Sequence, residues 1–174
     1  MWVLDAPSGF QTQGPAGPGE AGQWQELVSA EGGCTLSARG DVAEKPVEDM
    51  RTASMELLQS VAEADDAEAD PVQDRTLVSS GAGEGNEPKS TLTFVSADWA
   101  AGDAMVRGAS RVMSMLNYDG SMSSKSLALR FSCPGDTIDE DAWEAVTQNV
   151  RPVLHSGSPE DDPWTSRLTA PEAS

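Results

Sequence analysis

The sequence predicts an α+β protein whose folded body is a small ferredoxin-like domain in the C-terminal half of the chain. Aromatic residues make up 5% of the 174 positions, and 16 Gly and 11 Pro interrupt the chain, so a core cannot be spread evenly over its length. Apolar alternation and helical periodicity are concentrated after residue 90, where the expected order of elements is β-α-β-β-α. This order matches the split βαβ arrangement.

Two irregular arms are expected at the ends of the chain. Residues 1–45 are predicted to be a Pro/Gly-rich extended arm, because Pro and Gly interleave there with small polar residues. Residues 156–174 are predicted to be an acidic arm of similar composition. Isolated aromatic residues stand in both arms, namely Trp2, Phe10, Trp24 and Trp164. They are either scattered residues of a disordered tail or anchors that seat an extended segment in apolar pockets of a neighbouring protein.

An acidic amphipathic helix is predicted over residues 46–70. Pro46 suits the first helical position, and Pro71 ends the helix. The apolar face consists of Val47, Met50, Leu57, Leu58 and Val61. A helix of this length is not stable alone in water, so its apolar face must dock on the C-terminal domain or on another chain.

A flexible linker is predicted over residues 71–90. Its second half, SSGAGEGNEPKS, is rich in Gly and Ser and precedes a marked change in composition. We therefore expect a domain boundary at its end, with the small α+β domain spanning residues 91–155.

The α+β domain begins with a predicted strand over residues 91–97, TLTFVSA, in which Leu92, Phe94 and Ser96 share one side. A short helix is expected next, because apolar residues continue at helical spacing. Its expected face consists of Trp99, Ala100, Ala104, Met105 and Ala109.

A hairpin and a second helix complete the predicted domain. Segments 111–118 and 125–132 flank Asp119-Gly120, a dipeptide that supplies the positive φ angles of a hairpin turn. The helix is expected to start at a capping box formed by Thr137 and Glu140, to bury Trp143 and to end before Pro152. Residues 153–155 would then add a short edge strand.

The composition restricts the expected partners and location. The formal net charge of −18 disfavours direct binding to nucleic acid or to anionic membrane surfaces, because like charges repel. No apolar run approaches the roughly 20 residues that a membrane-spanning helix needs, and no basic segment precedes the first apolar residues as in a signal peptide. Cys34 and Cys133 lie far apart without a Cys or His cluster. One disulfide between them is the alternative, but unpaired thiols and an intracellular, reducing location are expected.

No motif predicts catalysis, a cofactor, a metal ion or a small-molecule substrate. His155 is the single histidine and has no carboxylate close to it in the sequence. The acidic clusters lack the ligand spacing of an EF-hand loop, and the GAGEG segment over residues 81–85 lacks the remainder of a phosphate-binding motif. We expect a protein that is not an enzyme.

The leading hypothesis is a structural or accessory subunit of a large protein assembly, such as a virion or a multi-subunit complex. Its partner-binding residues would be the four aromatic residues of the arms, Trp2, Phe10, Trp24 and Trp164. The alternative is an acidic inhibitor or regulator whose carboxylates mimic the charge of a nucleic acid and block a basic groove.

Overall fold

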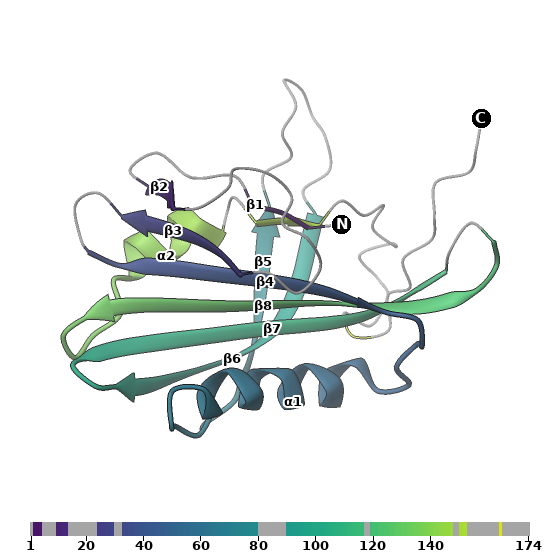
Figure 1. Cartoon of the computed structure of the whole chain (residues 1–174), viewed down its shortest axis with the longest axis horizontal. Helices are drawn as coiled ribbons and strands as arrows, with labels where there is room; N and C mark the ends of the chain where they lie inside the picture. The colour runs from purple at the N-terminus through teal and green to yellow at the C-terminus, as the bar shows by residue number, and fades with distance from the viewer. Residues whose placement is uncertain are drawn as a thin grey trace.

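The computed structural model shows an α+β fold in which two helices pack on a curved antiparallel sheet (Figure 1). The structure describes residues 2–4, 10–13, 24–29, 33–79, 90–116, 119–147, 150–152 and 164. Five strands run in the order β4-β8-β7-β6-β5, and β3 and β2 extend the sheet beyond β4. In chain order the sheet strands are β2 (Phe10–Gln13), β3 (Trp24–Ser29), β4 (Thr35–Ala43), β5 (Gln73–Ser79), β6 (Ser90–Ala101), β7 (Ala104–Leu116) and β8 (Met122–Pro134). A separate pair joins β1 (Trp2–Leu4) to β9 (Val150–Pro152).

The α+β class is confirmed, but the predicted ferredoxin-like topology is wrong. A split βαβ unit needs parallel strands joined by a crossover helix. Within the described residues every strand pair is antiparallel, and β5, β6, β7 and β8 follow one another as neighbours in the sheet. The sheet is therefore a meander to which β4 is added from the N-terminal side.

The helix expected after residue 97 is instead the junction of β6 and β7. Val95, Ala97 and Trp99 continue the alternation of the preceding segment and all lie buried on one face of the sheet. The chain then reverses at Gly102, whose φ of +64° is readily adopted only by glycine. Alternate residues of this segment are buried, as in a strand, and this pattern outweighs an Ala and Met content that is typical of a helix.

Parts of the predicted arm and linker belong to the sheet. Strand β4 falls within the predicted arm 1–45 and pairs with β8 over nine residues, from Thr35–Ser132 to Ala43–Ser124. Strand β5 falls within the predicted linker 71–90 and pairs with β6 from Gln73–Ser96 to Ser79–Ser90. The folded body therefore begins well before residue 91.

Both predicted helices exist, with later starting points than expected. Helix α1 spans Met50–Glu63, and its N-cap is Asp49, whose carboxylate accepts hydrogen bonds from Thr52 N (2.9 Å) and Thr52 Oγ1 (2.7 Å). Helix α2 spans Glu140–Thr147, and Asp139 Oδ1 accepts from Ala142 N at 3.0 Å. Asp139 therefore takes the capping role predicted for Thr137, and Asp49 caps a helix that was predicted to start at Pro46 but starts at Met50. The predicted edge strand 153–155 lies outside the described residues.

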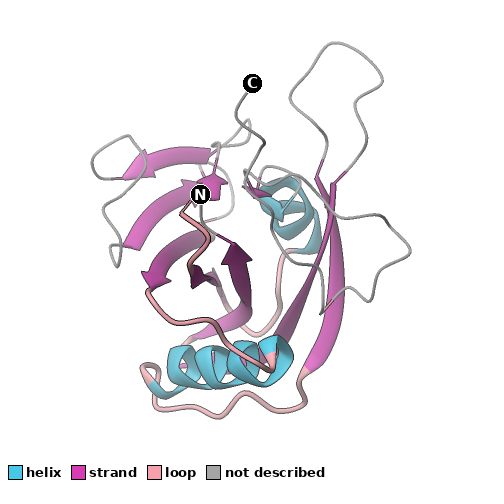
Figure 2. Ribbon diagram, turned by 90° about the vertical axis from the view of Figure 1, so that its right-hand side faces the viewer, coloured by secondary structure: helices cyan, strands magenta, loops and turns pink. Residues whose placement is uncertain are grey.

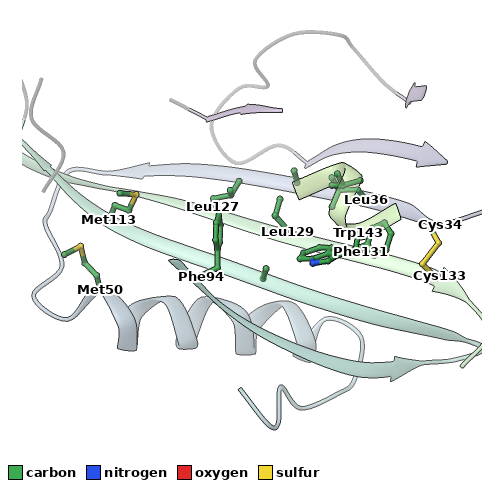
Figure 3. Packing of buried hydrophobic residues seen from close by; sticks show 13 residues of the cluster. Cys34, Leu36, Met50, Phe94, Met113, Leu127, Leu129, Phe131, Cys133 and Trp143 are labelled. Atoms are coloured by element: carbon green, nitrogen blue, oxygen red, sulfur yellow. A yellow bond between two sulfur atoms is a disulfide. The ribbon is translucent and has the colours of Figure 1, made fainter. Parts of the chain in front are cut away.

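The two helices lie on opposite sides of the curved sheet and cover two separate cores (Figure 2). The α2-side core contains Phe131 and Trp143, whose ring centroids are 5.5 Å apart (Figure 3). Its members are Cys34, Leu36, Ala38, Met50, Phe94, Ala109, Met113, Leu127, Leu129, Phe131, Cys133, Trp143 and Val146. The α1-side core consists of Leu58, Val61, Ala62, Ala69, Val95, Ala97, Trp99, Val106 and Ala128.

Serine side chains join α1 to β7 beneath the α1-side core. The register of β6 on β7 ends at the pair Val95–Ser110, and beyond it Val112 N donates to Ser54 Oγ of α1 at 2.8 Å. Ser54 Oγ in turn donates to Met50 O (2.6 Å), and Ser110 Oγ donates to Ser54 O (2.5 Å). Helix α1 thus satisfies a strand amide at a point where β6 no longer does.

Cys34 and Cys133 form a disulfide, so the prediction of unpaired thiols is wrong. The pair Thr35–Ser132 of β4 and β8 lies directly beside them, and strand pairing brings together two cysteines that are 99 residues apart in sequence. Both are almost fully buried at one end of the α2-side core. The bond ties the N-terminal strands covalently to the body of the sheet.

Candidate protein-binding site

Trp164 occupies a seat formed by three other elements of the chain. Its indole Nε1 donates a hydrogen bond to Asp74 Oδ2 of β5 at 3.0 Å. The guanidinium carbon of Arg111, on β7, lies 4.3 Å from the Trp164 ring centroid. Trp164 is half-buried and packs against the α1-side core. We call Arg51, Asp74 and Arg111 the Trp164 seat.

The carboxylate of the seat is held in place by helix α1. Arg51 Nη2 and Nε donate to Asp74 Oδ1 at 2.9 and 3.1 Å. These bonds from Arg51, and then the bond from Trp164, hold the pKa of the Asp74 carboxyl below its ordinary value. Asp74 therefore stays ionised and oriented as an acceptor for an indole N–H.

The cation of the seat is buried. Arg111 is fully buried, and its Nη1 donates to Thr93 O at 3.3 Å. A guanidinium over the face of an indole is a favourable cation–π arrangement, and it is stronger when water is excluded. The seat therefore combines an apolar contact, a hydrogen-bond acceptor and a stacked cation, which are the three features that recognise a tryptophan side chain.

The structure places the four sequence-predicted anchors in different positions. Phe10, in β2, is half-buried and packs against the α2-side core, whereas Trp164 packs against the α1-side core. Trp2 lies in β1 opposite Pro152, and Trp24 lies in β3 opposite Arg39; their side chains are outside the described residues. Phe10 and Trp164 thus pack against different cores.

The residues of the seat were not identified from the sequence. Arg111 stands in the segment RVMSML, in phase with Met113, and the alternation of a buried strand places both on the same side. A charged residue at a core position of a strand was the available signal, because such a residue needs a specific partner. The sequence could not identify Asp74, since β5 was assigned to a linker.

A second buried arginine fixes helix α2 to the sheet. Arg107 is 3% exposed; its Nε and Nη2 donate to Asp98 at 2.7 Å each, and its Nη1 and Nη2 donate to Glu140 at 2.6 and 2.8 Å. Its guanidinium carbon also lies 5.5 Å from the ring centroid of Trp143. Asp98, Glu140 and Trp143 all belong to elements of the fold, so we assign this cluster to structure.

Neither a metal site nor a membrane-spanning helix is found in the part of the chain that the structure describes. The described His, Cys, Asp and Glu side chains form no group of three that could hold a metal ion. None of the described helices is both long enough and apolar enough to cross a bilayer. His155 lies outside the described residues.

No protein-family model matches the chain, and no curated protein sequence matches it either.

Proposed function

We propose that this chain is a non-enzymatic structural or accessory subunit of a protein assembly, and that the Trp164 seat holds extended, tryptophan-bearing segments. The observation that carries the proposal is the contact of Trp164 with Asp74, 90 residues away in sequence, and with the buried Arg111. In the structure the seat is filled by the chain's own tryptophan. The same chemistry suits a tryptophan of a neighbouring subunit.

The sequence around Trp164 indicates the kind of segment that fits. The chain reads EDDPWTSR, and Pro163 immediately before the tryptophan disfavours the helical conformation at Asp162. A single aromatic anchor that fills a desolvated pocket can supply much of the binding energy of such a segment. The proposed partner segment is therefore extended, bears one tryptophan and does not need to be helical.

The disulfide supports an oxidising location for this function. Structural disulfides persist in oxidising compartments and are rare where glutathione keeps thiols reduced. The Cys34–Cys133 bond thus favours an extracellular or other oxidising environment over the intracellular location expected from the sequence. An accessory subunit in such a place would keep β4 attached to β8 during assembly.

A labelled peptide tests the seat directly. In the full chain, Trp164→Ala empties the seat, and a fluorescein-labelled peptide spanning residues 158–170 should then bind, as measured by anisotropy. The same peptide carrying Ala in place of Trp164 should bind at least about tenfold more weakly, because it lacks the indole. Adding Asp74→Ala to the full chain that carries Trp164→Ala should weaken binding of the intact peptide by a similar factor.

The same titrations can contradict the proposal that the Trp164 seat binds tryptophan. Circular dichroism first establishes that the Trp164→Ala variant is folded. If this folded variant binds neither peptide, or binds both equally, the seat does not recognise tryptophan.

The alternative function, an acidic inhibitor that mimics nucleic-acid charge, draws on a different observation. Exposed acids lie along α1 and the turn after it, namely Glu56, Glu63, Asp66 and Glu68, and the chain carries a net charge of −18. A complex held by these carboxylates should dissociate in high salt, since the Debye length falls to about 3 Å at 1 M. A complex held by aromatic anchors should resist salt.

Salt and substitution together separate the two functions. The native partner should be co-purified with the chain from its source under gentle conditions. Under the accessory-subunit proposal, replacing Trp2, Phe10 and Trp24 with Ala releases the partner, and 1 M salt releases little of it. Stripping by salt, with the aromatic substitutions harmless, would favour the inhibitor.

A further inference from the structure

A groove of about 360 Å³ runs between helix α1 and strands β4 and β8. Its apolar lining consists of Leu57, Val61, Ala64 and Ala128. Its polar lining consists of Ser37, Arg39, Ser60 and Arg130. Small-ligand sites have this composition, with an apolar surface and a few polar groups that fix the orientation of the ligand.

Arg130 is held in one position by a partly buried network. Its Nε and Nη2 donate to the two carboxylate oxygens of Asp65 at 2.8 and 2.9 Å. Asp65 Oδ2 also accepts from Trp99 Nε1 at 2.9 Å, so the carboxylate is oriented by a core residue. The Nη1 group of Arg130 takes part in neither bond to Asp65, and the side chain is 27% exposed. A positioned guanidinium at the wall of the groove is thus oriented before any ligand arrives.

Arg39 is the second cation of the groove, and its side chain is more exposed than that of Arg130. It pairs with Asp41 at 2.9 Å, and the two side chains are 44% and 41% exposed. An exposed pair of this kind adds little stability, so Arg39 can exchange Asp41 for another carboxylate at small cost. In a chain with 11 basic residues and a net charge of −18, two arginines converge on one groove.

We propose that this groove binds small amphipathic carboxylates, with the carboxylate at Arg39 and Arg130 and the apolar part against Leu57, Val61 and Ala128. The volume lies at the lower end of the range for small-molecule sites, which restricts the ligand to a short alkyl or single-ring carboxylate. The site is separate from the Trp164 seat and does not depend on the proposed subunit function.

The experiment uses the full chain, octanoate as the probe and octylamine as its cationic counterpart. Titration into ¹⁵N-labelled protein should shift the amide resonances of Ser60, Ala64 and Ala128, with a dissociation constant between about 10 μM and 1 mM for a ligand of this size. Octylamine has the same alkyl chain but the wrong charge, and it should bind at least about tenfold more weakly.

Two substitutions with opposite expected effects on affinity test whether the ligand's carboxylate binds at Arg39. Arg39→Gln should weaken octanoate binding about tenfold, because a charge-assisted hydrogen bond is lost. Asp41→Asn removes the internal competitor of the ligand and should strengthen binding by about two- to fivefold, the equivalent of a surface ion pair. Ala64→Trp should fill the groove and abolish the shifts.

Three results would overturn the proposal. These are an absence of shifts at the groove, equal binding of octanoate and octylamine, and an affinity that Arg39→Gln and Asp41→Asn leave unaltered. Because Arg39 and Asp41 are both exposed, neither variant should fail to fold, and thermal unfolding of each protein checks this.

Discussion

The two sides of the sheet are built on different interactions. On the α2 side, Phe94, Phe131 and Trp143 pack with aliphatic residues, and the disulfide closes one end of this core. On the α1 side, the helix is joined to β7 through the hydroxyls of Ser54 and Ser110. The arginine-lined groove lies beside α1, and Arg51 of α1 holds Asp74 of the Trp164 seat, whereas Arg111 of the seat is on the side of the sheet that carries Met113.

Because of this difference, one side of the sheet should contribute mainly to stability and the other mainly to binding. The α2-side core offers few positions for a polar group of a ligand, because each buried polar atom needs a partner and the buried Arg107 on that side is already bonded to Asp98 and Glu140. The α1 side already supports a polar network, so charged residues such as Asp74 and Arg130 are positioned there by neighbours. We therefore expect the largest stability effects on the α2 side and the largest binding effects on the α1 side.

The largest effect on stability should come from Trp143→Ala. Trp143 is 5% exposed, and its loss leaves a cavity beside Phe131 that should lower the free energy of unfolding by about 3 to 5 kcal/mol. Urea unfolding measures it, with Trp143→Phe as a milder control. A loss below about 1 kcal/mol would show that the α2-side core is not the main source of stability.

Removal of the disulfide should have the next largest effect. Replacing Cys34 and Cys133 together with Ala should cost about 2 to 4 kcal/mol, because the bond closes a long loop in the unfolded chain. Thermal unfolding with and without reductant, for the wild type and the double variant, gives the value. A wild type that is equally stable when reduced would contradict the expectation.

A smaller effect is expected on the α1 side from Ser54→Ala. The substitution leaves Val112 N without its hydroxyl acceptor, which should cost about 1 to 3 kcal/mol for a buried donor. Ser60→Ala is the matched control on the same helix, since Ser60 is exposed and its hydroxyl donates to Leu57 O, one turn earlier. Equal effects of the two substitutions would show that the hydrogen bond from Val112 to Ser54 does not link α1 to β7 in a way that matters for stability.

The smallest effect concerns acid pH at the Arg107 cluster. Hydrogen bonding to Arg107 lowers the pKa of Glu140 in the folded chain, so this pair stabilises the fold above the ordinary pKa of a glutamate. Its contribution is lost as pH falls through the lowered pKa. Glu140→Gln should therefore reduce the difference in stability between pH 6 and pH 3, as measured by urea unfolding. An unchanged difference would show that Glu140 contributes nothing through its charge.

Local sequence signals predicted several elements but not how they assemble. Asp119-Gly120 marked the turn between β7 and β8, where Gly120 has φ +80°, and this prediction is confirmed. The apolar stripe marked α1, but the helix starts at Met50 and not at Pro46, because the carboxylate of Asp49 accepts from a free amide of the first turn and caps the helix there. Such signals act over a few residues and are therefore visible in one sequence.

Long-range pairings were not predictable from the sequence in the same way. Strand β4 was hidden in a segment dominated by its Gly- and Pro-rich beginning, and its partner β8 follows 79 residues after its end, from Ala43 to Met122. The disulfide and the contact of Trp164 with Asp74 depend on that tertiary arrangement. The aromatic anchors could be proposed from composition. The residues that contact Trp164 could be identified only from the register of β5, β6 and β7.

The disulfide also makes a closed covalent ring of the chain from Cys34 to Cys133, which contains α1, β5, β6 and β7. Residues 80–89 belong to this ring and lie outside the described residues. A protease that cut the chain between Ser79 and Ser90 would therefore open the ring without releasing either part. The two fragments would run as one species until reduced, and β5 and β6 would remain neighbours in a molecule made of two chains.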